Sequence, residues 1–201
     1  RTQQLSDGSQ LSLASGTAVN VDFSMNQRRL ILLSGEIKVT VAKDKQRPFI
    51  VSTDQGEITA LGTQFIVKEN DDTTQLLMLE SVTRVENTTD ENRVIYAGHA
   101  LRFDRFHFSD IQTIDPHAIE SAWYAKVLVA ENMPLPRVLT TLASNRSGRL
   151  VFDKEALSSI DVSGVLPLDD TDAALDLLLQ RFPQLEVRYL TPYFVYVSKK
   201  V

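Results

Sequence analysis

The sequence predicts an all-β module followed by a small α/β domain, and three observations support this prediction. Short apolar–polar alternations, typical of strands, recur up to about residue 114, with turn residues between them. Asp115-Pro116 is typical of a helix start, with an aspartate cap before a proline. From residue 126 onward, strand-like and helix-like segments alternate. We therefore predict an all-β domain over residues 1–114, a helical connector over 115–125 and an α/β domain over 126–201.

Strands of the first module are indicated by alternation and by turn chemistry. Val19, Val21 and Phe23 share one face of a predicted strand, whereas polar residues occupy the other face. Residues 29–33 include a continuous apolar run, which predicts a strand buried on both faces. Many short strands at this spacing fit either a solenoid-like stack or an irregular sandwich, and the sequence does not choose between them. Turn signals lie at Asp7-Gly8, Ser15-Gly16, Ser34-Gly35 and Ala97-Gly98.

The second module has the pattern βαβ followed by βαββ. Pro134 opens one predicted helix, and Asp169-Asp170-Thr171 caps the other. The apolar faces of these helices are formed by Leu135, Val138, Leu139 and Leu142, and by Ala174, Leu175, Leu178 and Leu179. Predicted strands are residues 126–132, 150–152, 162–168, 185–189 and 194–197.

Composition excludes several classes of function. The chain has 201 residues and a formal net charge of −5, which disfavours a nucleic-acid-binding role because phosphates need a basic surface. It has no cysteine, so disulfides, zinc–thiolate sites and cysteine nucleophiles are excluded. No apolar run approaches the ~20 residues of a membrane span, and residues 1–30 lack a signal-peptide pattern. We expect a soluble piece of a longer protein.

No residue pattern indicates chemistry. His99, His107 and His117 do not have metal-ligand spacing. Paired carboxylates such as Asp169-Asp170 fit helix capping better than a hydrolase pair, and Ser163-Gly164 lacks the context of a nucleophile elbow. We predict no catalytic residue, no cofactor, no metal site and no enzymatic activity.

A sheet edge in the second module is the predicted partner-binding surface. Edge strands carry unpaired backbone donors and acceptors, so they can accept an added strand. The alternative is an edge covered by the rest of the domain, and the leucine-rich helix faces are expected to form the core. The two candidate edges contribute Lys126, Leu128 and Ala130 from one segment, and Val162, Gly164, Val165 and Leu166 from the other.

Residues 3–103 resemble the FecR family domain. Two departures from the family pattern concern Ser81, where the family usually has glycine, and Ile37 with Val39, where an aromatic residue is common. The ordered set that carries the resemblance is Asp7-Gly8-Ser9, Gly35-Glu36, Arg47-Pro48-Phe49, Val51, Gly62-Thr63, Phe65, Val67, Leu79-Glu80 and Ala97-Gly98.

Residues 126–199 resemble the short N-terminal domain of secretins and TonB-dependent transducers, the STN module. The module usually has a Gly-Thr-Gly turn after its second helix, where this chain has Arg181-Phe182-Pro183. Trp123 also fits the sensor family, and the two-part arrangement is most similar to its PupR-type members. The matching residues are Pro134-Leu135, Val138-Leu139, Leu142-Ala143, Val151-Phe152-Asp153, Val162, Gly164, Ala174-Leu175 and Leu178-Leu179.

Together the resemblances imply the periplasmic region of a FecR/PupR-type sensor, a single-pass inner-membrane protein that regulates iron–siderophore signalling. They imply contact with the periplasmic signalling domain of a TonB-dependent outer-membrane transducer. They also imply an extracytoplasmic-function (ECF) sigma factor, bound by a cytoplasmic segment outside this sequence. A secretin-like assembly module is one alternative, and a glycan-processing β protein is another. The siderophore and the sigma factor are not specified by the residues.

Overall fold

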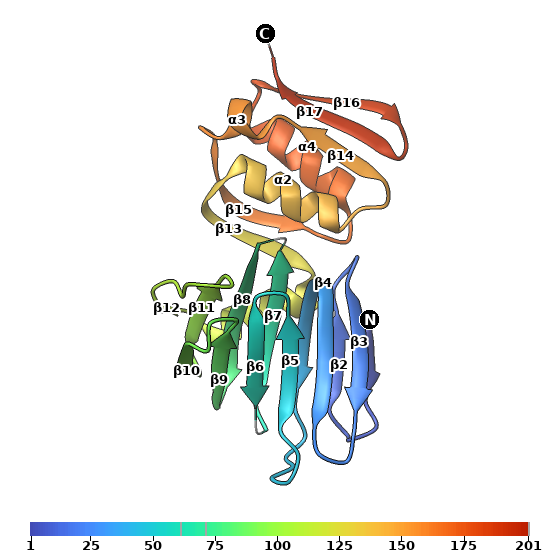
Figure 1. The fold of residues 1–201 in the computed structure, drawn as a ribbon. Coiled ribbons are helices and arrows are strands. Elements are labelled where there is room, and N and C mark those ends of the chain that lie inside the picture. The colour runs from blue at the N-terminus through green and yellow to red at the C-terminus, as the bar shows by residue number, and fades with distance from the viewer. Residues whose placement is uncertain (61, 71, 201) are drawn as a thin grey trace. The chain divides into compact units, whose positions relative to one another are not determined.

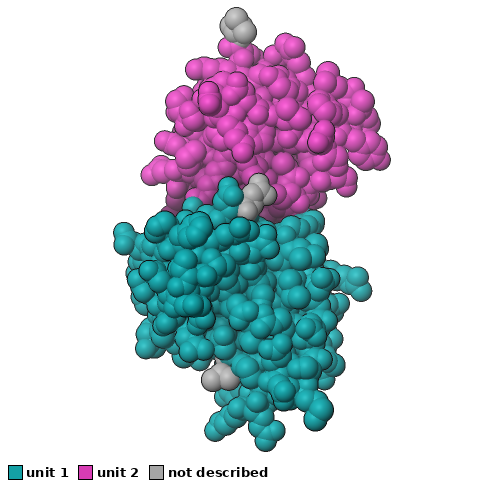
Figure 2. All heavy atoms as spheres, viewed as in Figure 1, with its two compact units in different colours: residues 1–120 teal, residues 121–201 magenta. Residues whose placement is uncertain are grey.

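In the computed structural model, which describes residues 1–60, 62–70 and 72–200, the chain divides into two compact units (Figures 1 and 2). They comprise Arg1–Glu120 and Ser121–Val201. The division falls within helix α1, Pro116–Ala125, in the segment predicted as a helical connector. Asp115 caps this helix, as predicted, by accepting hydrogen bonds from the backbone N–H groups of His117 and Ala118. No helix in the described part of the chain is long and apolar enough to cross a membrane.

The first unit is a curled 12-stranded sheet over its described residues (Figure 1). The main path runs β10-β9-β6-β5-β4-β7-β8-β11-β12, and β1, β2 and β3 branch from it. The strands are β1 (Thr2–Gln4), β2 (Gln10–Leu13), β3 (Ala18–Phe23), β4 (Arg28–Thr40), β5 (Phe49–Thr53), β6 (Gly56–Ala60), β7 (Gln64–Asn70), β8 (Thr73–Glu80), β9 (Val82–Asn87), β10 (Asn92–Tyr96), β11 (His99–Phe103) and β12 (Gln112–Thr113).

Strand β4 belongs to both halves of the curled sheet. Its first part pairs with β3 and β5, and its second part pairs with β2 and β7. The change occurs at Gly35, whose φ is +91°, and an added Cβ would lie 2.6 Å from Thr17 Oγ1. Glu36 and Thr17 brace this point, because the Thr17 hydroxyl donates to the Glu36 carbonyl and accepts from the Glu36 N–H, both at 3.0 Å. Only glycine fits this bend.

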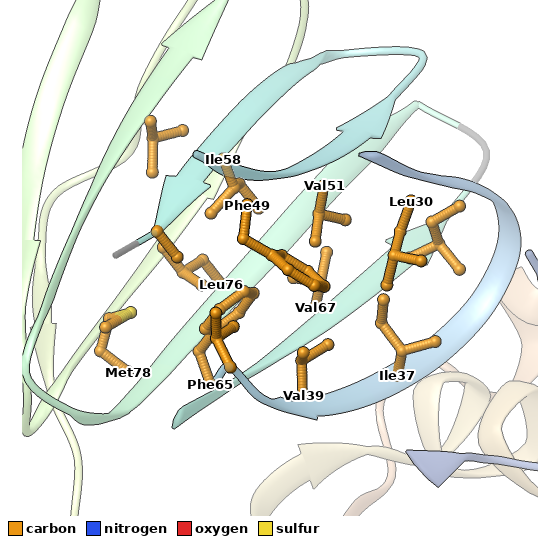
Figure 3. Close-up of a cluster of buried hydrophobic side chains, with 14 of the residues drawn as sticks. Leu30, Ile37, Val39, Phe49, Val51, Ile58, Phe65, Val67, Leu76 and Met78 are labelled. Carbon is orange, nitrogen blue, oxygen red and sulfur yellow. The ribbon is translucent and has the colours of Figure 1, made fainter. Parts of the chain in front are cut away.

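The two halves face each other across one core, so the irregular sandwich is the correct alternative and the solenoid-like stack is wrong. A solenoid would stack successive coils through repeated parallel pairing. Among the described strand pairs of this unit, β4–β5 is parallel and the others are antiparallel. Figure 3 shows the core, which includes Leu30, Ile37, Val39, Phe49, Val51, Ile58, Phe65, Val67, Leu76 and Met78.

The run at residues 29–33 is not buried on both faces, contrary to the prediction. Leu30 and Leu32 are buried, but Ile31 is only half-buried and Leu33 is 55% exposed. The outer face of β4 is therefore open to solvent at Leu33, and an apolar run alone does not distinguish one covered face from two.

The first turns of α1 are held by the sheet of the first unit. Lys38 of β4, whose side chain is 4% exposed, donates to the Glu120 carboxylate, and Gln64 of β7 donates to the same oxygen at 2.7 Å. The pKa of Glu120 is lowered, mainly by the hydrogen bond from Lys38.

The second unit alternates strands and helices in the predicted order, with one addition. The short helix α3 was not predicted, and Asp153 caps it by accepting from the N–H groups of Glu155 and Ala156. The strands form two sheets, β13-β15 and β14-β17-β16. The elements are β13 (Val127–Pro134), α2 (Leu135–Ser144), β14 (Arg149–Phe152), α3 (Lys154–Leu157), β15 (Asp161–Pro167), α4 (Thr171–Arg181), β16 (Leu185–Thr191) and β17 (Phe194–Lys199).

The core of the second unit is built from the helix faces that the sequence predicted. Asp170 caps α4, as expected, by accepting from the Ala173 N–H at 3.0 Å. Strand residues Leu150, Val195 and Val197 complete the same cluster. The buried helix residues are Leu135, Val138, Leu139, Leu142, Ala174, Leu175 and Leu178, and Leu179 is partly buried against them.

We expect Leu139→Ala to lower the free energy of unfolding by about 2–5 kcal/mol, because it leaves a cavity in this small core. Leu139 is fully buried, whereas Leu177 on α4 is 44% exposed, so Leu177→Ala is the matched control. The control should change stability by less than about 0.5 kcal/mol. Urea unfolding followed by circular dichroism measures both, and equal effects would contradict the assignment of the core.

Candidate functional site

A buried ion pair stands at the start of β4. The side chains of Arg28 and Asp7 are 0% and 2% exposed, and Arg28 Nη1 lies 2.8 Å from Asp7 Oδ2. Arg28 Nη1 also donates to the Ala42 carbonyl at 2.9 Å. Its Nε and Nη2 both donate to the Arg47 carbonyl, at 3.1 and 2.9 Å. The guanidinium is therefore held on several sides by fixed acceptors, which a buried charge requires.

The turn Asp7-Gly8-Ser9 supplies the carboxylate side of this pair. Asp7 accepts from the Ser9 N–H at 3.0 Å and from the Ser9 hydroxyl at 2.6 Å. The Ser9 hydroxyl in turn accepts from the Ala42 N–H at 2.9 Å. Gly8 adopts a φ of +85°, which glycine allows without strain. The turn therefore holds the Asp7 carboxylate in position to accept from the Arg28 guanidinium.

Arg47-Pro48-Phe49 supplies the other side. The Arg28 guanidinium lies over the Phe49 ring, 5.3 Å from its centroid, and the Arg28 N–H donates to the Pro48 carbonyl at 3.0 Å. Phe49 also packs edge-to-face with Phe23, with ring centroids 5.9 Å apart. Two segments that were singled out from the sequence thus meet at Arg28. Arg28 itself was not identified from the sequence. The signal was alternation, since Arg28, Leu30 and Leu32 share the inward face of β4.

The environment of Asp7 favours its charged form. Burial would raise the pKa of Asp7, but hydrogen bonds from the Ser9 hydroxyl, the Arg28 guanidinium and the Ser9 N–H, with the arginine's charge, lower it below the ordinary value. A carboxyl with a lowered folded pKa stabilises the protein above its unfolded pKa of about 3.9. This stabilisation is lost as the pH falls through the folded pKa.

We predict that Asp7→Asn lowers the free energy of unfolding by about 3–5 kcal/mol near pH 7, because it leaves Arg28 buried without its counter-ion. Glu57→Gln is the control, since Glu57 pairs with Arg29 but is 46% exposed and should matter by less than about 1 kcal/mol. Unfolding measured from pH 7 down to pH 3 should show the Asp7→Asn deficit shrinking in acid. A deficit that stayed constant would show that the charge of Asp7 is not what stabilises the unit.

The predicted partner-binding residues lie in and beside the β13–β15 sheet, and most of their side chains point inward. Ala130, Val162 and Leu166 are at most 5% exposed and belong to the core, and Leu128 packs against it. Val165 is 58% exposed. Lys126 precedes β13, and its carbonyl accepts from Leu168 at 2.8 Å; Gly164 lies in β15 with a φ of +155°.

The two candidate edges are not separate, because β13 and β15 pair with each other. Each retains one edge without a strand partner among the described residues. Sequence reasoning missed Val129, which lies opposite Val165 and is 46% exposed. Strict alternation along residues 127–130, with Leu128 and Ala130 inward, would have identified it.

The backbone groups of Val129 and Val165 point away from the shared ladder. Leu168 donates to Lys126 across the strand pair, and antiparallel pairs alternate between hydrogen-bonded and non-hydrogen-bonded positions. Counting inward from that bond, the Val129–Val165 pair is non-hydrogen-bonded. Each residue therefore directs its N–H and C=O to the outer edge of its strand.

The three histidines lie in separate segments of the chain. In the described part of the chain, no group of three or more His, Cys, Asp or Glu could hold a metal ion. His99 begins β11, and His117 lies in α1. The His107 side chain is mostly exposed, and its Nδ1 lies 3.5 Å from Asp104 Oδ1.

Two solved structures share the fold of this chain. Two crystal structures of a protein from Parabacteroides distasonis, described as a "putative anti-sigma factor", share this fold, each with a TM-score of 0.82 and 19% sequence identity. The similarity covers 100% of this chain and 94% or 95% of those chains. No curated protein matches the chain.

The fold and the buried network define a β sandwich locked by an internal ion pair, followed by a small α/β unit. Residues 1–84 match the family model described as "FecR protein". This match confirms, for residues 1–84 of the 201, the resemblance to the FecR family that was stated from the sequence. The likeness of the second unit to the STN module stays a prediction.

The departure from the family pattern at Ser81 has a structural counterpart. Ser81 joins β8 to β9 with a φ of +65°, a left-handed conformation that costs a non-glycine residue about 1–2 kcal/mol. The backbone thus keeps a shape suited to the family's glycine.

After α4, the turn at residues 181–183 is closed by Phe182 and not by the Gly-Thr-Gly turn usual in the STN module. The Phe182 N–H donates to the Leu178 carbonyl, and the Phe182 carbonyl accepts from the Leu185 N–H.

Ser81→Gly should therefore stabilise the first unit, by about 0.5–1 kcal/mol once the greater flexibility of unfolded glycine is counted. Thermal and urea unfolding measure the change. Ser24→Gly in the β3–β4 turn is the comparison, since the Ser24 hydroxyl accepts from the Gln27 N–H at 3.2 Å and its loss should destabilise. No gain at Ser81 would mean that the left-handed residue is not strained.

Proposed function

We propose that this chain is the periplasmic signalling region of a FecR-type inner-membrane regulator of an ECF sigma factor. The FecR domain over residues 1–84 carries the proposal. Its support is that the whole chain shares its fold with a putative anti-sigma factor, both units included. The motif residues of the domain are used for folding, in the Arg28 network, so a binding role falls to surfaces elsewhere.

Within this role, the second unit binds the signalling domain of a TonB-dependent outer-membrane transducer. The β13–β15 sheet suits strand addition because both outer edges expose backbone groups and an apolar side chain, at Val129 and at Val165. An added Cβ at Gly164 would meet no heavy atom within 4 Å, so one face of β15 is open at this residue. The bulge between Ala130 and Met133 limits a regular added strand on β13 to its first half.

The bound transducer would pass its signal to the sigma factor through the segment of the regulator outside this sequence. The residues described here supply recognition and no chemistry. In this proposal the transducer sets the specificity for the siderophore, because the regulator contacts the transducer's signalling domain and not the siderophore. The regulator's specificity would rest on alternate side chains along the added strand.

We predict that Val165→Pro weakens binding of the transducer's signalling domain by about tenfold or more. Proline removes an amide that β13 does not use, so the partner loses a hydrogen bond while the β13–β15 ladder is kept. Val129→Pro makes the same change on the other edge, and Val165→Thr keeps the amide and the branched side chain. Titration calorimetry measures affinity, and circular dichroism checks the fold.

The pattern of results identifies the surface. Loss with one proline only assigns that edge, and a matching loss with Val165→Thr would assign the effect to the side chain instead. Unchanged affinity in both folded proline variants would eliminate strand addition at this sheet. No binding of the wild-type chain to any transducer signalling domain of its own genome would overturn the proposed function.

A further inference from the structure

Strand β3 carries an edge that nothing in the described part of the chain covers. It pairs with β4 on one side, and its other side has no strand partner among the described residues (Figure 1). The strand reads Ala-Val-Asn-Val-Asp-Phe and contains neither lysine nor proline. Val21 in its middle is 48% exposed. Natural proteins usually blunt such an edge with lysine, proline or a bulge.

The backbone groups on this edge can be assigned. Arg28 donates its N–H to Pro48, on the β5 side of β4, so the facing pair Phe23–Arg28 is not hydrogen-bonded. The pattern alternates along the ladder. Val19, Val21 and Phe23 therefore direct their N–H and C=O groups away from β4, toward the open edge.

Three other open edges among the described strands are less regular or shorter. β16 has a register shift between Tyr189 and Thr191, and β13 has one between Ala130 and Met133. β10 is shorter and carries Arg93, which is held over the Phe108 ring at 5.1 Å. The ladder of β3 is regular from residue 19 to 23, with its one irregularity at the Ala18 end.

We infer that the occupant of this edge is a second copy of the chain, paired antiparallel about a two-fold axis at Val21. In this register Val21 lies opposite the partner's Val21, and Val19 lies opposite the partner's Phe23. The outward groups of these three residues then match with about six backbone hydrogen bonds. The contact is isologous, so it closes into a dimer and does not propagate into a fibre.

The charges of β3 favour a copy of itself in this register. Asn20 lies opposite the partner's Asp22, so an amide can donate to a carboxylate, and no like charges oppose each other. Branched and aromatic side chains meet on the other face, which are favourable cross-strand pairs. This inference does not depend on the proposed transducer binding, because it concerns the first unit alone.

Sedimentation velocity of the chain over micromolar to high-micromolar concentrations tests the dimer. We expect a concentration-dependent dimer for the wild type. Val21→Lys and Val21→Glu should each weaken it by about tenfold or more, because each places like charges directly opposite across the axis. An equimolar mixture of the two variants should dimerise again, because the lysine of one copy then faces the glutamate of the other.

Val94→Lys is the matched control, since Val94 is 47% exposed on the edge strand β10, and it should leave the dimer unchanged. Circular dichroism melting verifies that each variant is folded. A wild type that stays monomeric throughout overturns the inference, as does a folded Val21→Lys protein that dimerises normally. Failure of the mixture to dimerise rules out the register centred on Val21. If the wild type is monomeric and Val21→Lys abolishes binding of the transducer's signalling domain, the occupant of the β3 edge is that domain instead of a second copy.

Discussion

Burial of Arg28 is the constraint on which the first unit depends. A guanidinium at 0% exposure is tolerable only because Asp7, Ala42 and Arg47 supply acceptors fixed by their own backbones. Those acceptors come from three segments, the turn before β2 and the two ends of the loop between β4 and β5. If one of these segments were displaced, the Arg28 guanidinium would stay buried with part of its charge uncompensated. That would cost far more free energy than the loss of a surface contact.

The position of Arg28 also sets the register of β4. Because side chains alternate along a strand, a slip of one residue would turn Arg28 outward and bring the exposed Leu33 inward. β4 continues past Gly35 into the other half of the sheet, where Ile37 and Val39 are buried. One ion pair at the start of the strand thus fixes the pairing of both halves. The bend at Gly35, braced by Thr17, transmits that register from one half to the other.

The sequence was informative where local chemistry decides the structure. Helix caps at Asp115 and Asp170, the inward leucines of α2 and α4, and the alternating strands all follow from short-range rules. It could not choose between solenoid and sandwich, because that choice depends on pairing between distant strands such as β4 and β7. The run at 29–33 misled for the same reason, since neighbours decide whether a second face is covered.

The candidate site shows the same limit more sharply. The segments 126–132 and 162–168 were correctly predicted as strands. Their pairing with each other could not be seen from the sequence, so inward residues such as Ala130 and Leu166 were included with Val165. The motif residues of the FecR domain were visible, but their common partner Arg28 was not, because a charged residue in an apolar run is usually assigned to the surface. Three-dimensional pairing supplied both corrections.

Exposed strand edges remain the part of this fold that its core does not explain. The Arg28 network and the helix faces account for how each unit excludes water, and neither requires β3, β13 or β15 to leave backbone groups unpaired. An exposed edge is a liability for unwanted association, so its retention is more consistent with use than with chance. The edges also differ in kind. β3 is regular from Val19 to Phe23, and this stretch can pair favourably with itself. β13 has a bulge in its middle, and β15 includes Gly164 and Pro167, so these edges suit a shorter and more selective match. The described residues assemble no metal-binding cluster, but a protein of this kind can still act in signalling if its exposed strand edges bind different partners.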